Sequence, residues 1–125
     1  MNDIITPVRA EACAVLTLVL KGKWYDMIAS GAKWEEYRLF KLYWHTRIAN
    51  WRSKNMACVV EFRRGYAKNA PRMSFLVVSV DRRISCSGHP KHPEWGEPKF
   101  VPYYAIELGK RVELTHNMEA YYESK

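Results

Sequence analysis

An apolar run of helical spacing that stops at a glycine is the feature that most constrains the fold of this chain. The run covers Trp24–Ser30, and Gly31 follows it directly. Glycine adopts the left-handed conformation that closes many helices at little cost, so Gly31 is expected to end a helix. The residues that follow, Ala32–Arg38, predict a turn and a short strand.

Three charged residues lie close together in this predicted turn and strand. Side chains alternate along a strand, so Glu36 and Arg38 are expected to share a face. Lys33 precedes the strand and reaches the same place from the turn. A carboxylate between two cations stays ionised, and a lysine beside it is well placed for a phosphate or a carbonyl group. The alternative interpretation is a purely structural ion pair at the edge of a sheet.

Apolar periodicity predicts the other elements. An amphipathic helix is expected over about residues 41–52, because apolar residues recur there at helical spacing. Apolar, β-branched runs predict strands at 14–20, 56–62 and 73–80. Residues 103–114 predict either one strand or a hairpin around Gly109 and Lys110, and the Gly- and Pro-rich residues 85–102 predict a loop. The whole chain, 1–125, is expected to be one domain with a flexible lead-in at about residues 1–12.

The spacing of Gly31, Lys33, Glu36 and Arg38 resembles the signature of the ASCH domains, small members of the PUA-like superfamily. A strand before the helix, a glycine–tyrosine loop at 62–71 and a closing strand at 103–109 also resemble bacterial and phage ASCH proteins. The resemblance covers roughly residues 14–114. It implies an α+β fold, built as a small, curved, mainly antiparallel PUA-like β-barrel with two or so flanking helices. The signature residues would then lie in a pocket under the mouth of the barrel.

The bacterial acetylcytidine amidohydrolases look like relatives, and their signature lysine is catalytic. Lys33 of this chain matches that lysine. Their second catalytic residue is a threonine, where this chain has Glu36, and their third is a glutamate on a late helix, where this chain has a Pro/Gly loop. The resemblance therefore carries over Lys33 and not the rest of that catalytic set.

Charge and aromatic content point toward a polyanionic partner. The chain has 125 residues, with 20 Lys and Arg against 13 Asp and Glu, a net charge of +7 and a pI near 9.4. Its aromatic residues include five Trp, more than a core of this size needs. Some are therefore expected to be exposed platforms for stacking bases. The tryptophans at 24, 44 and 51 are instead expected on apolar helical faces.

A basic loop with one tyrosine is the second candidate binding element. It contains Arg63, Arg64, Tyr66 and Lys68, which suit phosphates and one stacked base. The alternative is a solvated charged hairpin. Trp95, in the predicted 85–102 loop, is expected to be a base platform or pocket wall on a lid. Its alternative is packing back onto the barrel.

The cysteines and histidines give no convincing metal site. The motif Cys86-x-x-His89-x-x-His92 has short spacing, but no fourth ligand with matching spacing accompanies it. We therefore expect no metal and no cofactor. Three irregularly spaced cysteines, no recognisable signal peptide and no apolar run of membrane length predict a cytoplasmic protein with reduced thiols and no membrane partner.

The leading functional hypothesis is binding of RNA or a nucleotide-like ligand in a basic cleft. The alternative is a hydrolase acting on single-stranded RNA or on a modified nucleoside such as acetylcytidine. On RNA, Lys33 would stabilise the pentacoordinate phosphate and Glu36 would take the 2′-hydroxyl proton. On acetylcytidine, Lys33 would activate a nucleophile or the acyl oxygen, and a glutamate from the lid would act as acid and base. A third possibility is an interaction module that keeps the basic surface and tolerates loss of Glu36. The expected ligand-binding residues are Arg38, Arg63, Arg64, Tyr66, Lys68 and Trp95.

Overall fold

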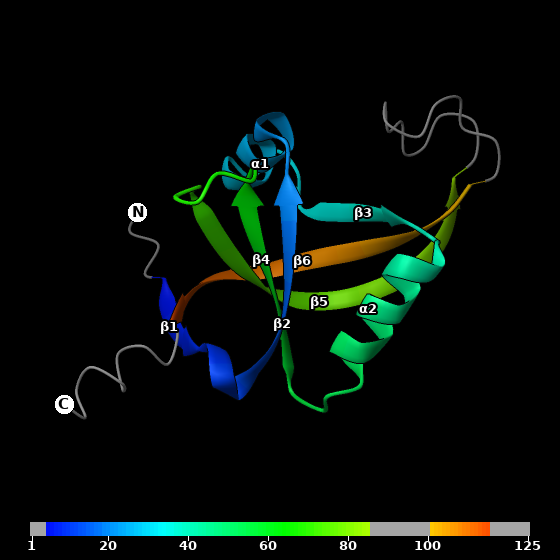
Figure 1. Ribbon diagram of the computed structural model, residues 1–125, viewed down its shortest axis with the longest axis horizontal. Coiled ribbons are helices and arrows are strands. Elements are labelled where there is room, and N and C mark those ends of the chain that lie inside the picture. The colour runs from blue at the N-terminus through cyan, green and yellow to red at the C-terminus, as the bar shows by residue number, and fades with distance from the viewer. Residues whose placement is uncertain (1–4, 86–100, 116–125) are drawn as a thin grey trace.

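The computed structural model describes residues 5–85 and 101–115, which form a small α+β fold (Figure 1). Its elements, in chain order, are β1 (Thr6–Arg9), the short 3-10 helix η1 (Ala10–Ala12), β2 (Cys13–Leu20), α1 (Gly22–Ala29), β3 (Glu35–Leu39), α2 (Leu42–Arg52), β4 (Ala57–Arg64), β5 (Arg72–Ser85) and β6 (Val101–Thr115). The predicted second helix is thus confirmed, and it begins one residue later than expected. Across the described residues, no helix has the length and apolar character needed to cross a membrane.

The six strands form one mostly antiparallel sheet in the order β1-β6-β5-β4-β2, with β3 also on β6. The β4–β5, β5–β6 and β3–β6 pairs are antiparallel, whereas β1–β6 and β2–β4 are parallel. The long β6 pairs with β3 near its start, from Tyr103 to Glu107, and with β1 near its end. Within the described residues β2 and β3 each have one strand partner, so the sheet is open between them and is not a closed barrel.

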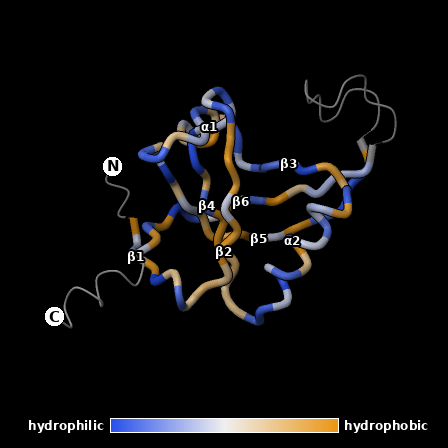
Figure 2. The backbone as a smooth tube through the Cα atoms, viewed as in Figure 1, coloured by the Kyte–Doolittle hydropathy of each residue, from blue (hydrophilic) through white to orange (hydrophobic). Residues whose placement is uncertain are grey.

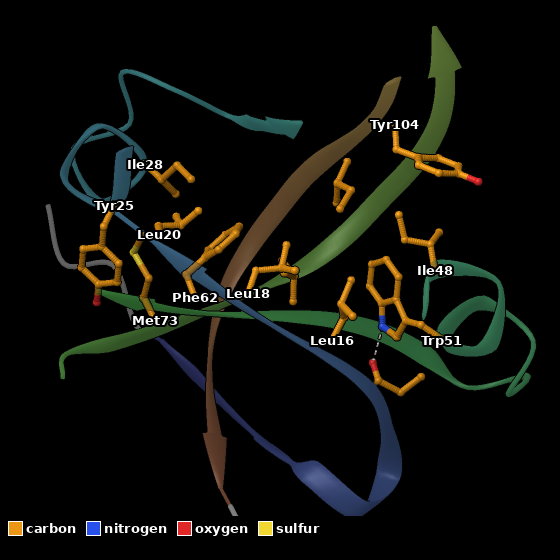
Figure 3. Close-up of a cluster of buried hydrophobic side chains, with 13 residues drawn as sticks. Leu16, Leu18, Leu20, Tyr25, Ile28, Ile48, Trp51, Phe62, Met73 and Tyr104 are labelled. Carbon is orange, nitrogen blue, oxygen red and sulfur yellow. Dashed lines mark hydrogen bonds between the residues drawn. The ribbon is translucent and has the colours of Figure 1, made fainter. Parts of the chain in front are cut away.

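The core lies on one face of β2 and β4. The burial of β2 alternates residue by residue, and Leu16, Leu18 and Leu20 all face inward, as the period of two in a strand requires. They pack with Phe62 of β4 and with residues of both helices (Figure 3). From α2, Trp51 enters this cluster and donates its indole N–H to the Ala14 carbonyl at 2.8 Å, which satisfies its polar atom.

The predicted end of α1 is confirmed. Gly31 has a φ of +83°, the left-handed conformation that favours glycine. Two residues later, the Lys33 backbone N–H donates to the Met27 carbonyl at 3.1 Å, which ties the turn to the last turn of α1. The Leu108 N–H donates to the Trp34 carbonyl at 2.9 Å, which ties the same turn to β6. The turn between α1 and β3 is therefore held from both sides.

Two sequence expectations need correction. Residues 6–9, placed in the flexible lead-in, form β1, because their backbone pairs with residues 112–115 of β6. The hairpin alternative around Gly109 is also wrong, since β6 runs through it as one strand. Gly109 is needed there for close approach: a Cβ would lie 3.0 Å from the Val78 side chain and 3.2 Å from the Leu76 carbonyl oxygen, beside an irregularity in the β5–β6 register.

Candidate functional site

A buried carboxylate between two cations forms the centre of the candidate site. Glu36 and Arg38 share one face of β3, as the alternation predicted, and Arg38 Nη2 donates to Glu36 Oε2 at 2.8 Å. Lys33 Nζ donates to the other oxygen, Oε1, at 2.7 Å. The side chain of Glu36 is only 4% exposed and that of Lys33 11%. Both carboxylate oxygens therefore accept charge-assisted hydrogen bonds in a nearly water-free setting.

Aromatic rings pack against the two cations. Lys33 Nζ lies 5.0 Å from the ring centroid of Trp24 and 5.3 Å from that of Tyr37. The guanidinium of Arg38 lies 4.8 Å from the ring centroid of Trp44. These are cation–π distances, so the rings from α1, β3 and α2 fix the orientation of both cations. Trp24 and Trp44 also pack on the core, which agrees with their predicted place on apolar helical faces.

The opposite face of β3 is clamped to β5. Arg83 donates two hydrogen bonds to the Glu35 carboxylate, at 3.0 and 2.8 Å, and the Tyr37 hydroxyl donates to it at 2.9 Å. The bonds from Arg83, followed by the one from Tyr37, lower the pKa of Glu35 despite its partial burial. Burial and the neighbouring Glu35 raise the pKa of Tyr37. The strand that carries Glu36 and Arg38 is thus held rigidly on both faces.

A cleft of about 410 Å³ opens beside Arg38, where the sheet is not closed. We call it the β2–β3 cleft, because residues of both strands line it. Its lining consists of Val19, Leu20, Lys21, Trp24, Glu36, Tyr37, Arg38, Leu39, Lys41, Trp44, Gly65 and Tyr66. In Figure 1 the end of β2, the start of β3 and α1 meet in this region, and Figure 2 shows β3 mostly hydrophilic beside the apolar β2. The lining carries three cations and one carboxylate, and that carboxylate is already paired.

Both α-helices of the described chain begin at this cleft. The N-cap residue is Lys21 in α1 and Lys41 in α2, and neither helix start has a side-chain cap or an acidic residue in its first turn. Lysine is a poor residue at this position, because it cannot accept a hydrogen bond from the helix and is repelled by the positive end of the helix dipole. Unpaired N–H groups at helix starts attract anions. The two helix starts and their lysines therefore make the cleft electropositive.

The predicted basic loop reaches the cleft only in part. Tyr66 lies at its rim and is 85% exposed. Arg64 instead forms a bidentate pair with Asp26 of α1, with both hydrogen bonds at 3.0 Å, and these bonds lower the pKa of Asp26. Arg63 donates to the Ala67 carbonyl at 2.9 Å within its own loop. Lys68 is exposed and is not part of the lining.

The expectation that Arg63, Arg64 and Lys68 line one cleft with Arg38 is therefore corrected. The physical reason is that Arg63 and Arg64 are consecutive in β4 and point to opposite sides, and each is held by a partner outside the cleft. Gly22 makes the Arg64–Asp26 contact possible: a Cβ at this position would lie 2.6 Å from Arg64 Nη2. Arg64 thus fastens the loop to α1 and holds Tyr66 near the cleft.

Some sequence predictions fall on residues that the structure does not describe. Trp95 and the Cys86/His89/His92 motif lie between residues 86 and 100, outside the described ranges. In the part of the chain that is described, no group of three or more His, Cys, Asp or Glu side chains is arranged to hold a metal.

The sequence interpretation missed Lys21 and Lys41 as site residues. The sequence gives only a weak signal, because the predicted helices begin at Trp24 and at about residue 41, so neither lysine stands out as the cap residue that it is in the structure. Their meeting at one cleft depends on how the two helices are placed by the sheet, which neither local sequence reveals.

Comparison with known proteins adds no assignment. No family model matches this chain, and no curated protein and no solved structure matches it either.

Proposed function

We propose that this chain is an ASCH-type domain that binds single-stranded RNA, or a nucleotide-like ligand, in the β2–β3 cleft. The observation that carries the proposal is the convergence of Lys21, Arg38 and Lys41 with the starts of two helices at one opening. Each of these features favours an anion, and phosphate is the anion that such arrangements bind in many proteins. The spacing of the signature residues, which form the ionic centre beside the cleft, is the support for the ASCH-type assignment.

The aromatic residues suit the other half of a nucleotide. Tyr66 presents an exposed ring at the rim, and the Trp44 ring lines the wall beside Arg38. Stacking of a base on an aromatic ring is favourable for every base, so it gives affinity without strong sequence preference. A phosphate beside the lysines and a base on Tyr66 would together occupy the cleft.

Cysteines 13 and 58 are unpaired, which suits the cytoplasmic location that we propose for an RNA-binding protein.

The geometry favours binding over hydrolysis. As a general base, Glu36 would have to take a proton from the substrate, whereas each of its oxygens already accepts a charge-assisted hydrogen bond, from Lys33 or from Arg38, in a site that is almost fully buried. The same ion pair engages the Lys33 amine that an amidohydrolase would use. Incubation of the protein with single-stranded RNA and with acetylated cytidine, followed by product analysis, tests this directly. Turnover of either compound would assign the cleft to a hydrolase instead.

The binding test is a titration of labelled single-stranded oligouridylate at several salt concentrations. We expect the affinity to fall steeply with salt, with a log–log slope of about −0.7 for each phosphate contacted on a single strand. Lys21→Gln and Lys41→Gln should each weaken binding and make the slope shallower. Lys54→Gln is the matched control, because this exposed lysine follows the other end of α2. A flat salt dependence, or equal effects of all three substitutions, would remove the proposal.

A further inference from the structure

A second cation–aromatic group lies on α2, directly beyond the wall of the cleft. The guanidinium of Arg47 lies 5.4 Å from the ring centroid of Trp44, the same ring that packs against Arg38. It also lies 5.4 Å from the ring centroid of Tyr43. Tyr43 and Trp44 meet edge to face, with centroids 4.8 Å apart. Trp44 therefore connects the β2–β3 cleft with a neighbouring group, Tyr43 and Arg47, that the cleft lining does not include.

The position of this second group is fixed. Arg47 Nη1 donates to the Tyr43 hydroxyl at 2.7 Å, and Nη2 donates to the Thr17 carbonyl of β2 at 3.4 Å. These two bonds use two of the five N–H donors of a guanidinium, which leaves donors for a phosphate. Arg47 thus connects α2 with β2, two elements that also contribute residues to the cleft lining.

Tyr43 is poorly explained by packing. It is 59% exposed, and its neighbour Leu42 is 80% exposed, so neither side chain belongs to the core. A large exposed ring next to a positioned arginine is the pair of features that single-stranded nucleic acid uses, one for the base and one for the backbone. The alternative interpretation is that Tyr43 and Arg47, four residues apart on the helix surface, interact only to stabilise α2.

The cleft and the neighbouring group together offer more aromatic rings and cations than the single base and single phosphate of a mononucleotide require. Tyr66 and the three cations belong to the cleft lining, and Trp44 of the same lining contacts both Tyr43 and Arg47. A mononucleotide has one base and would leave the Tyr43 group empty. We propose that Tyr43 and Arg47 form a second subsite, and that the ligand is a single-stranded RNA segment of several nucleotides rather than a mononucleotide. This inference rests on the proposed function of the cleft.

Calorimetric titrations with uridine 5′-monophosphate and with hexauridylate test the proposal. Wild-type protein should bind the hexamer at least about tenfold more tightly than the monomer, because the second subsite adds a stacked base and a phosphate contact. Tyr43→Ala and Arg47→Gln should each weaken the hexamer by about fivefold or more while monomer binding stays unchanged. Arg52→Gln removes the same charge from the last turn of α2, where the residue is exposed, and should change neither.

The possible outcomes separate this inference from the function on which it rests. If the hexamer does not bind to wild-type protein, the proposed function itself fails. If monomer and hexamer bind equally, or if Tyr43→Ala and Arg47→Gln leave hexamer affinity unchanged, only the second subsite is overturned. The Tyr43 side chain is so exposed that Tyr43→Ala should change the melting temperature little. A loss of hexamer affinity in this variant therefore reports on binding and not on misfolding.

Discussion

Lys33 Nζ and Glu36 Oε1 lie 2.7 Å apart, in an ion pair from which water is almost fully excluded. Lys33 lies in the turn before β3, and a lysine in a turn is usually exposed, so that its truncation changes stability little. Here its side chain is instead largely buried against Trp24 and Tyr37. Removing one member of a buried pair leaves the other charge partly uncompensated, which costs far more than the pair contributes as a whole.

Lys33→Ala is therefore expected to lower the free energy of unfolding by about 1–3 kcal/mol, since Arg38 still partners the stranded carboxylate. Chemical denaturation with a fluorescence readout measures this. Lys54→Ala is the control, and it should stay within about 0.5 kcal/mol of the parent because Lys54 is exposed. Equal stabilities for the two variants would show that the Lys33–Glu36 pair is not held in solution.

At position 38, stability and ligand affinity should depend more on the shape of the side chain than on its charge. Arg38→Ala is expected to cost stability, by about 1–3 kcal/mol or more, and ligand affinity together, because it leaves Glu36 without its second partner and removes a cation from the cleft. Arg38→Lys keeps the charge but loses the planar group that lies over Trp44. We expect Arg38→Lys to recover only part of both losses in denaturation and titration experiments. Full recovery would mean that charge alone matters at this position.

Lowering the pH should reduce the stability of the fold, because the Glu35 carboxylate becomes protonated. Its pKa is lowered in the folded state by the hydrogen bonds from Arg83, relative to its ordinary value of 4.5. The stability from this group is therefore fully present above about pH 4.5 and is lost as the pH falls through the lowered pKa. Glu35→Gln should reduce stability at pH 7 and flatten its dependence between about pH 5 and pH 2. A pH profile parallel to that of the parent would refute the role of the Glu35–Arg83 pair.

The cost in stability of replacing Gly31 should depend on the backbone conformation that the new residue must adopt, and not on the room available for its side chain. No atom lies within 4 Å of a Cβ placed there, but its φ is +83°. Gly31→Val should lower stability by about 1–2 kcal/mol or more, whereas Gly31→Asn should cost clearly less, because asparagine enters the left-handed region more easily. Thermal melts of the two variants give the comparison. Equal melting temperatures would argue against the left-handed turn.

The parts of the fold and site that local sequence determines were predictable. The helix end at Gly31 and the shared face of Glu36 and Arg38 follow from backbone conformation and from the period of a strand. The pairing of Arg64 with Asp26, 38 residues apart, does not, because it depends on how β4 lies against α1. The same holds for Lys21 and Lys41, which meet only because the sheet brings two helix starts to one opening.

Tyr66 offers the sharpest test of base stacking, because its side chain is 85% exposed and contributes little to the core. Tyr66→Ala is expected to weaken oligouridylate binding by about 1–3 kcal/mol if the ring stacks on a base, with the melting temperature nearly unchanged. Tyr66→Phe keeps the ring and removes only the hydroxyl, so its affinity should stay close to that of the parent. Fluorescence anisotropy titrations of the three proteins at one salt concentration measure the difference. If Tyr66→Phe loses as much affinity as Tyr66→Ala, the hydroxyl and not the ring makes the contact. If neither variant loses affinity, the ligand does not reach this rim of the cleft.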